Sequence, residues 1–307
     1  MFKGPAFIFY TMESTKTSVG TSGITPFKQE DIQHLLSKQI GNAAGVYLKC
    51  HKKYFYNNDV QNCFIDCSAG NMNLNCKTSP FTFITTLRKF EYYPSKLFLI
   101  EKCKDTFCEL EANFKILNER SNYNVMPSLF REDYVMNDNR KDICKVPPEI
   151  KILRTDMSKF LYSLSHNRYR YGLLYFDPNG FTLDDYIAIF DFINGNQSMD
   201  IIININVTQI ARNRGVKKIK GFDKYHNVDL TILMAKFNQY KKTIYIRNNI
   251  NLEQHNHIDS TNKFVLLFGT NNPNFIMPGT YNFVQLNSKC GQDVINKYNY
   301  NESNNAI

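Results

Sequence analysis

The sequence predicts an α/β fold, with a mostly parallel sheet covered by helices on both faces. Short apolar strands alternate with helical segments from about residue 62 to 206, a pattern typical of consecutive βαβ units. The strands expected at 172–177 and 199–206 are nearly continuous apolar runs, as for strands buried on both sides. We therefore place these two strands in the centre of the sheet.

The individual elements follow from their ends and their apolar spacing. A first helix should begin near Thr25-Pro26, with Thr as its cap and Pro in its first turn, and end at Gly41. The turn-rich stretch between the last two expected strands predicts an antiparallel hairpin at the sheet edge. The elements expected between these ends are strand 62–66, helix 79–90, strand 96–101, helix 105–119, strand 151–155, helix 157–166, strand 172–177, helix 182–194, strand 199–206, a helix near 228–241, and strands near 264–269 and 281–286.

The length and composition favour a single domain. With 307 residues, of which 43% are hydrophobic, the chain can bury the core of one fairly large domain. We assign that domain to residues 25–290, between a flexible segment over 1–24 and a polar tail over 291–307. A charged, Asn-rich insert at about 121–149 interrupts the alternation. We expect it to act as a lid or a target-recognition insert, or, if the protein is a scaffold, to bind another protein.

Two classes of protein are disfavoured. No apolar run approaches the ~18 residues needed to span a bilayer, so we expect a soluble, cytoplasmic protein without membrane contact. The eight cysteines lack C-x-x-C spacing, and neither the Cys50-His51 pair nor His255 and His257 match a common ligand pattern. We therefore expect reduced thiols and no metal site.

Acidic residues end the first two strands of the predicted sheet. Asp66 ends the first strand and enters a small-residue turn, and Glu101 ends the second strand. Such a turn lets the backbone approach a ligand, and the second acid can accept hydrogen bonds from both ribose hydroxyls. The pattern predicts a nucleotide-type cofactor site. Its first part consists of Asp66, Ser68, Ala69, Gly70 and Asn71.

Two further polar features follow strands three and four. Asp156 comes after the third strand, and Asp177-Pro178-Asn179-Gly180 after the fourth. Asp66 and Asp156 could instead cap the helices that follow them, and the third feature is also a good turn sequence. Their shared position at the carboxyl edge of the sheet, where α/β proteins bind ligands, favours a site.

These features together resemble the fold of S-adenosylmethionine-dependent methyltransferases. A narrower resemblance, spanning about residues 25–270, is to the three-Cys-motif partner proteins of bacteria and phages. The motifs that carry it are Thr25-Pro26-Phe27-Lys28, Ser79-Pro80, Asp177-Pro178-Asn179-Gly180, and Ile203-Asn204-Ile205 followed by Ala211-Arg212-Asn213.

The resemblance implies a Rossmann-like, seven-stranded sheet of order 3-2-1-4-5-7-6, with strand 7 antiparallel. The stretch from Asp66 to Asn71 would wrap the methionine part of S-adenosyl-L-methionine, Glu101 would bind the ribose, and Asp156 with Met157 the adenine. The turn after strand four would face the transferred methyl group, which makes Asp177, Pro178 and Asn179 the implied catalytic residues. In amino-methyltransferases with a similar turn, the acid and a backbone carbonyl accept hydrogen bonds from the target amino group.

The chain departs from that pattern in two places. Asn179 and Gly180 stand where amino-methyltransferases carry a second Pro and an aromatic ring, so any stacking on the substrate would come from Phe181. The first turn has Asn71-Met72-Asn73 where a second Gly is expected, and Asn tolerates positive φ better than most residues.

The predicted function is methyl transfer from S-adenosylmethionine to an amino nitrogen of a nucleic acid. The net charge of +9 and the pI near 9.0 suit a nucleic-acid partner, although a solvated basic loop would give the same charge. The alternatives are a cofactor-binding but catalytically silent scaffold and a nicotinamide-dependent oxidoreductase, which the absence of a three-glycine fingerprint disfavours. The basic residues expected to contact phosphates are Arg212, Arg214, Lys217, Lys218 and Lys220.

Overall fold

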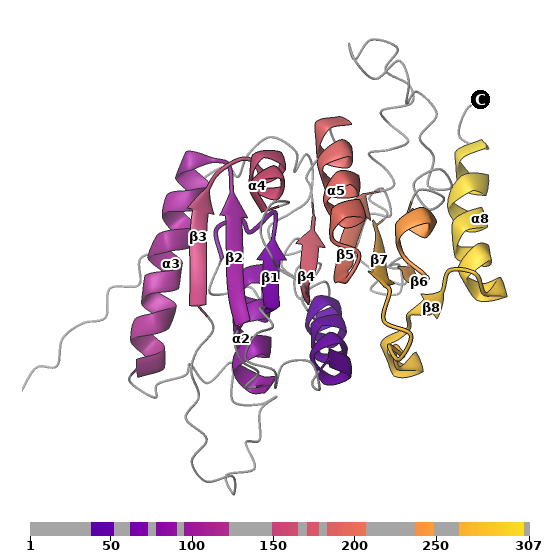
Figure 1. The fold of residues 1–307 in the computed structure, drawn as a ribbon, viewed down its shortest axis with the longest axis horizontal. Helices are drawn as coiled ribbons and strands as arrows, with labels where there is room; N and C mark the ends of the chain where they lie inside the picture. Colours follow the sequence, from indigo (N-terminus) through magenta and orange to yellow (C-terminus); the bar gives the residue numbers. More distant parts are fainter. Residues whose placement is uncertain are drawn as a thin grey trace, which may run out of the picture.

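A computed structural model describes residues 38–51, 62–72, 78–90, 95–122, 149–164, 171–177, 183–206, 237–248 and 264–303. In this part of the chain an eight-stranded sheet forms the middle layer, and helices cover both of its faces (Figure 1). The strands are β1 (Asn62–Asp66), β2 (Ser95–Glu101), β3 (Glu149–Arg154), β4 (Tyr171–Phe176), β5 (Met199–Asn206), β6 (Thr243–Asn248), β7 (Phe264–Thr270) and β8 (Val284–Gln285). The helices are α2 (Ser79–Phe90), α3 (Lys104–Asn122), α4 (Met157–Leu164), α5 (Leu183–Gly195) and α8 (Lys289–Ser303), with a 3₁₀ turn η3 (Gly279–Tyr281) and a helical segment over 38–51.

The strand order is β3-β2-β1-β4-β5-β7-β6-β8. The first five strands of this order are parallel, β7 is antiparallel to both β5 and β6, and β8 is antiparallel to β6. This is the order that the methyltransferase resemblance implied, with one short strand added at the edge. The predicted fold class is confirmed.

Each face of the sheet has its own core. The segment 38–51, α2 and α3 pack on one face, where they meet Leu173 and Tyr175 of β4. Helices α4, α5 and α8 pack on the other face, against Leu174 and Phe176 of the same strand. Because successive side chains of β4 are buried on opposite sides, the strand reads as a continuous apolar run.

Gly41 does not end the first helix, because residues 38–51 are all helical. A Cβ atom at Gly41 would lie 3.1 Å from Cγ2 of Thr82 in α2. The glycine therefore allows close packing between two helices. In the sequence, a glycine with this tertiary role cannot be told from a glycine that ends a helix. The predicted start at Thr25-Pro26 lies outside the described residues, as does the segment 1–24.

The predicted hairpin between 264–269 and 281–286 is wrong in its pairing. Strand β7 pairs with β5 and β6, while β8 is only two residues long and pairs with β6. Strand β6 was not predicted, although Thr-Ile-Tyr-Ile has the β-branched and aromatic composition of a strand. The antiparallel character of the C-terminal strands is confirmed. Of the helix expected at 228–241, residues 237–241 are described, and 237–240 are helical.

Helix α8 covers residues 291–303 of the range expected to be a polar tail. Ser288 caps it, since its Oγ accepts a hydrogen bond from the Gly291 N–H at 3.1 Å, and Ile295 is buried in the core. Of the expected insert, residues 121–122 belong to α3 and Glu149 to β3, and 123–148 lie outside the described ranges. No helix in the described part of the chain is long and apolar enough to cross a membrane.

Candidate active site

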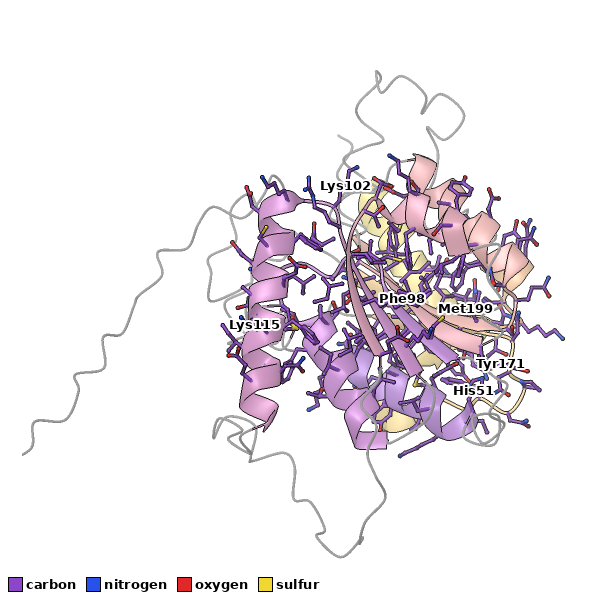
Figure 2. The ribbon with its side chains drawn as sticks, turned by 60° about the vertical axis from the view of Figure 1, so that its left-hand side comes forward. His51, Phe98, Lys102, Lys115, Tyr171 and Met199 are labelled. Carbon is purple, nitrogen blue, oxygen red and sulfur yellow. The ribbon has the colours of Figure 1, made fainter. Side chains whose placement is uncertain are left out.

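Three of the predicted acids lie in a row along the carboxyl edge of the sheet. In the strand register, Asp66 of β1 is level with Leu99 of β2 and with Tyr175 of β4. Glu101 and Asp177 each follow those partners by two residues, so all three acids lie on the same face of the sheet. Lys102, next to Glu101, lies at the opposite end of the sheet from Tyr171 and His51 (Figure 2). The strand order therefore brings together acids that are far apart in the sequence.

Glu101 holds the small-residue turn in place. Its Oε2 accepts a hydrogen bond from the Gly70 N–H at 3.1 Å, and its Oε1 accepts one from the Cys103 N–H at 2.7 Å. Gly70 has a φ of 63°, which glycine adopts without strain, and a Cβ atom there would meet nothing within 4 Å. The turn is thus fixed from one side and open beside Gly70. Each carboxylate oxygen of Glu101 keeps a lone pair for a ligand.

Helix α3 anchors the next residues of the turn. The Asn71 side chain donates to Glu109 Oε2 at 3.0 Å, and the Asn113 side chain donates to the Asn71 carbonyl at 2.8 Å. The non-glycine residue of this turn with positive φ is Met72, at 48°, and not Asn71. The Met72 side chain is fully buried in the core, and this packing offsets the cost of its unusual backbone.

Asp66 is buried completely at the start of the turn. Its Oδ1 accepts a hydrogen bond from the Ser68 N–H at 3.1 Å, whereas its Oδ2 has no hydrogen-bond partner among the described residues. Burial raises the pKa of Asp66 to about 7 and the charges of Asp177 and Glu101 add to the rise, while the hydroxyl of Ser79 and the Ser68 N–H act against it. Asp66 is therefore a buried acid whose Oδ2 accepts no hydrogen bond from the described residues, with the Ser79 hydroxyl nearby.

Asp177 is held by its own small network. The Tyr175 hydroxyl donates to its Oδ2 at 3.0 Å, the Asn204 side chain donates to its Oδ1 at 2.9 Å, and its backbone N–H donates to Ser68 Oγ at 3.3 Å. Burial raises the pKa of the Asp177 carboxyl, and the bonds from Asn204 and Tyr175 act against this rise. The network fixes the carboxylate and links it to the turn after β1.

Tyr175 and Asn204 belong to the site but were not predicted from the sequence. Both side chains are nearly inaccessible to solvent. A lone amide inside the apolar run from Ile201 to Ile205 is a usable signal, because a buried amide needs a hydrogen-bond partner. The Oδ1 atom of Asn204 accepts no hydrogen bond from the part of the protein that the structure describes.

Asp156 has a structural role as the cap of α4. Its Oδ1 accepts from both the N–H (3.0 Å) and the Oγ (2.5 Å) of Ser158, and its Oδ2 lies 2.7 Å from Nζ of Lys102. Lys102 holds the pKa of Asp156 down at about 2, together with the bonds from Ser158. Met157 is buried at the first helical position. The capping alternative therefore holds for Asp156, and its contact with adenine stays a prediction.

Several predicted residues lie outside the described ranges. Pro178 and Asn179 follow Asp177 directly, and their part in catalysis stays a prediction. The same holds for the basic residues Arg212, Arg214, Lys217, Lys218 and Lys220.

No protein-family model and no curated protein matches the sequence. Among solved structures, a protein from Legionella pneumophila is similar over 78% of this chain and 86% of its own, with 13% identity and a TM-score of 0.46. The methyltransferase domain of bacterial CtHen1-C is similar over 77% and 98%, with 11% identity and a TM-score of 0.36. The plantazolicin methyltransferase BpumL, solved in complex with SAH, is similar over 80% and 91%, with 11% identity and a TM-score of 0.33. At these identities the likeness concerns the fold alone.

Replacing Glu101 by Ala should loosen the turn as well as remove the predicted hydrogen-bond acceptor for a ribose. The N–H groups of Gly70 and Cys103 would lose their acceptor, so we expect a loss of about 1 kcal/mol in stability and at least a tenfold weaker binding of S-adenosylhomocysteine. Thermal unfolding and titration calorimetry measure the two effects. Glu111→Ala, which removes an exposed carboxylate from α3, is the control and should change neither. Unchanged binding in Glu101→Ala would remove this residue from the site.

Proposed function

We propose that this protein is a methyltransferase that uses S-adenosylmethionine and methylates an amino nitrogen of a nucleic acid. The observation that carries the proposal is the row of Asp66, Glu101 and Asp177 at the carboxyl ends of adjacent strands, tied together through the turn after β1. Open α/β sheets bind their ligands at this edge.

The residues fit the cofactor by their chemistry. S-adenosylmethionine carries a cationic sulfur and an ammonium group, and the neighbouring carboxyls of Asp66 and Glu101 suit these positive charges. The buried Oδ2 of Asp66, which lacks a partner in the described structure, suits the ammonium group as an acceptor. Glu101 retains lone pairs for the ribose hydroxyls, and Asp156 could accept from adenine once the exposed Lys102 side chain moves aside. When bound, the cofactor supplies an electrophilic methyl group.

Asp177 is the residue that acts on the acceptor. Tyr175 and Asn204 each occupy one lone pair of its carboxylate, which leaves one lone pair on each oxygen for the N–H groups of a substrate amine. These hydrogen bonds turn the nitrogen lone pair toward the methyl group. As the N–C bond forms and the C–S bond breaks, the amine loses a proton, and Asp177 is placed to receive it. Burial favours the protonated acid and so assists this step.

The nucleic-acid part of the proposal is supported by charge. The chain has 37 Lys and Arg against 28 Asp and Glu, which is an excess of nine positive charges. Such an excess attracts a polyanion. A scaffold that binds the cofactor without transferring its methyl group would bind the same ligands, so only turnover separates the two.

Binding of the cofactor is the first test. At 100 times its dissociation constant, S-adenosylmethionine or S-adenosylhomocysteine should stabilise the protein by about 2.7 kcal/mol, measured as a shift in thermal unfolding. Incubation with methyl-labelled S-adenosylmethionine and separate DNA, RNA and protein pools should then label a nucleic acid. Stabilisation by NAD alone would favour an oxidoreductase. Stabilisation by S-adenosylmethionine without transfer to any pool would favour a scaffold.

A further inference from the structure

Arg247 of β6 lies at the same edge of the sheet as the acids. Strands β5 and β6 run in the same direction, because both are antiparallel to β7, which lies between them. Asn204 of β5 and Arg247 of β6 are both paired with Leu266 of β7, one from each side. Directly paired residues share a face of the sheet. Arg247 therefore extends the polar row beyond Asn204, on the face that carries Asp177.

The Arg247 side chain is held in one orientation. Its Nη1 donates a hydrogen bond to the Tyr281 carbonyl, and its guanidinium carbon lies 5.8 Å from the centre of the Phe283 ring. A cation over an aromatic face at this distance is attracted to the ring. The guanidinium is thus positioned before any ligand binds.

The charge of Arg247 is not balanced within the described part of the protein. There it forms no ion pair, and its Nε is buried without a hydrogen-bond partner. Burial lowers the pKa of Arg247, and no neighbouring carboxylate counteracts the effect. Partial burial of an unpaired cation costs free energy. An anionic ligand would offset this cost.

We propose that Arg247 binds a backbone phosphate of the nucleic acid whose base is held at Asp177, an assignment that rests on the proposed function. Arginine suits this role because its planar guanidinium can donate two parallel hydrogen bonds to a phosphate. Three strand spacings, or about 14 Å, separate β6 from β4. At about 3.4 Å per phosphate along a stacked strand, the anchored phosphate lies roughly four nucleotides from the target base.

Arg247→Met tests the assignment by removing the charge while keeping an apolar side chain over Phe283. The probe is a short fluorescein-labelled single-stranded oligonucleotide, whose binding is followed by anisotropy at several salt concentrations in the presence of S-adenosylhomocysteine. We expect affinity to fall about tenfold or more and the salt slope to become shallower by about one. Lys115→Met removes an equal charge from the outer side of α3 (Figure 2) and should change neither quantity.

Two further measurements separate the possible causes of weaker oligonucleotide binding. Arg247→Lys keeps the charge but loses the planar guanidinium with its two parallel donors, so it should retain the salt slope with weaker affinity. This variant also serves as the test if Arg247→Met does not fold. An oligonucleotide with uncharged methylphosphonate linkages should bind the wild type and Arg247→Met equally, because it offers no anion. Unchanged oligonucleotide affinity and slope in both Arg247 variants, with S-adenosylhomocysteine still bound, would contradict the assignment alone. Failure of the wild type to bind S-adenosylhomocysteine would contradict the proposed function.

Discussion

Replacing Asp66 by Asn should stabilise the ligand-free protein at neutral pH and abolish cofactor binding. The pKa of Asp66 is about 7 in the folded protein against 3.8 in a model peptide, a difference that corresponds to about 4 kcal/mol. Between these values the folded state keeps a proton that the unfolded chain has released. The stabilising effect of this group is therefore fully present below pH ~4 and is lost as the pH rises toward 7. Asn is neutral throughout and can still accept the Ser68 N–H.

The measurement is chemical unfolding of wild type and Asp66→Asn at several pH values from about 4 to 8. The wild type should lose stability across this window, and the variant should lose less. Asp200, buried beside Lys241 near the amino end of β5, also has a raised pKa and adds a slope of the same sign in both proteins. Asp191→Asn, on the exposed side of α5, is the control and should behave as wild type. Equal pH slopes in wild type and Asp66→Asn would show that the pKa of Asp66 is the same in the folded and unfolded states, which would contradict the prediction.

A gain in stability coupled to a loss of binding would mark Asp66 as a functional residue. A buried acid with an unpaired oxygen is unfavourable for folding alone, and under the proposed function a cationic group of the ligand would offset that cost. The same reasoning applies to Arg247, at the end of the row opposite Glu101. The two ends differ in sign, as expected for a cationic cofactor and an anionic substrate.

The sequence was sufficient for features that depend on local patterns. The strands around Phe64, Leu99 and Leu174 are short apolar runs bounded by polar residues, and the structure places them within two residues of the predictions. The acids at the strand ends were found for the same reason. In a parallel sheet the end of each strand lies at one edge, so position in the sequence indicates position in space.

Features that depend on tertiary contacts were not predictable. Gly41 lies within a helix, where the absence of a side chain lets Thr82 of α2 pack closely against it. Met72 adopts positive φ because the core holds its side chain. The partnership of Asn204 with Asp177 requires knowing that β5 lies beside β4 in the right register. Strand β6 pairs only with strands that follow it in the chain, so the alternation of strands and helices that indicated β1 to β5 did not extend to it.

Replacing Asp177 by Ala should lower methyl transfer by ~10² or more and leave cofactor affinity within about threefold. The carboxylate is proposed to contact only the accepting amine, and loss of one preorganised transition-state contact has this magnitude. Calorimetry with S-adenosylhomocysteine and product formation on the best substrate measure the two quantities. Asp191→Ala on α5 is the control and should retain wild-type values. Equal turnover in wild type and Asp177→Ala would remove Asp177 from the mechanism.

Asn204→Leu separates positioning from catalysis at the same site. The Asn204 hydrogen bond lowers the pKa of Asp177, so its loss should raise that pKa and move the acid limb of the pH–rate profile to higher pH. A purely structural role would lower activity equally at every pH. Turnover in Asn204→Leu should therefore recover in part as the pH is raised, because a larger fraction of Asp177 is then ionised and able to accept the amine N–H. Asp177→Ala should show no such recovery, because it has no carboxylate to ionise.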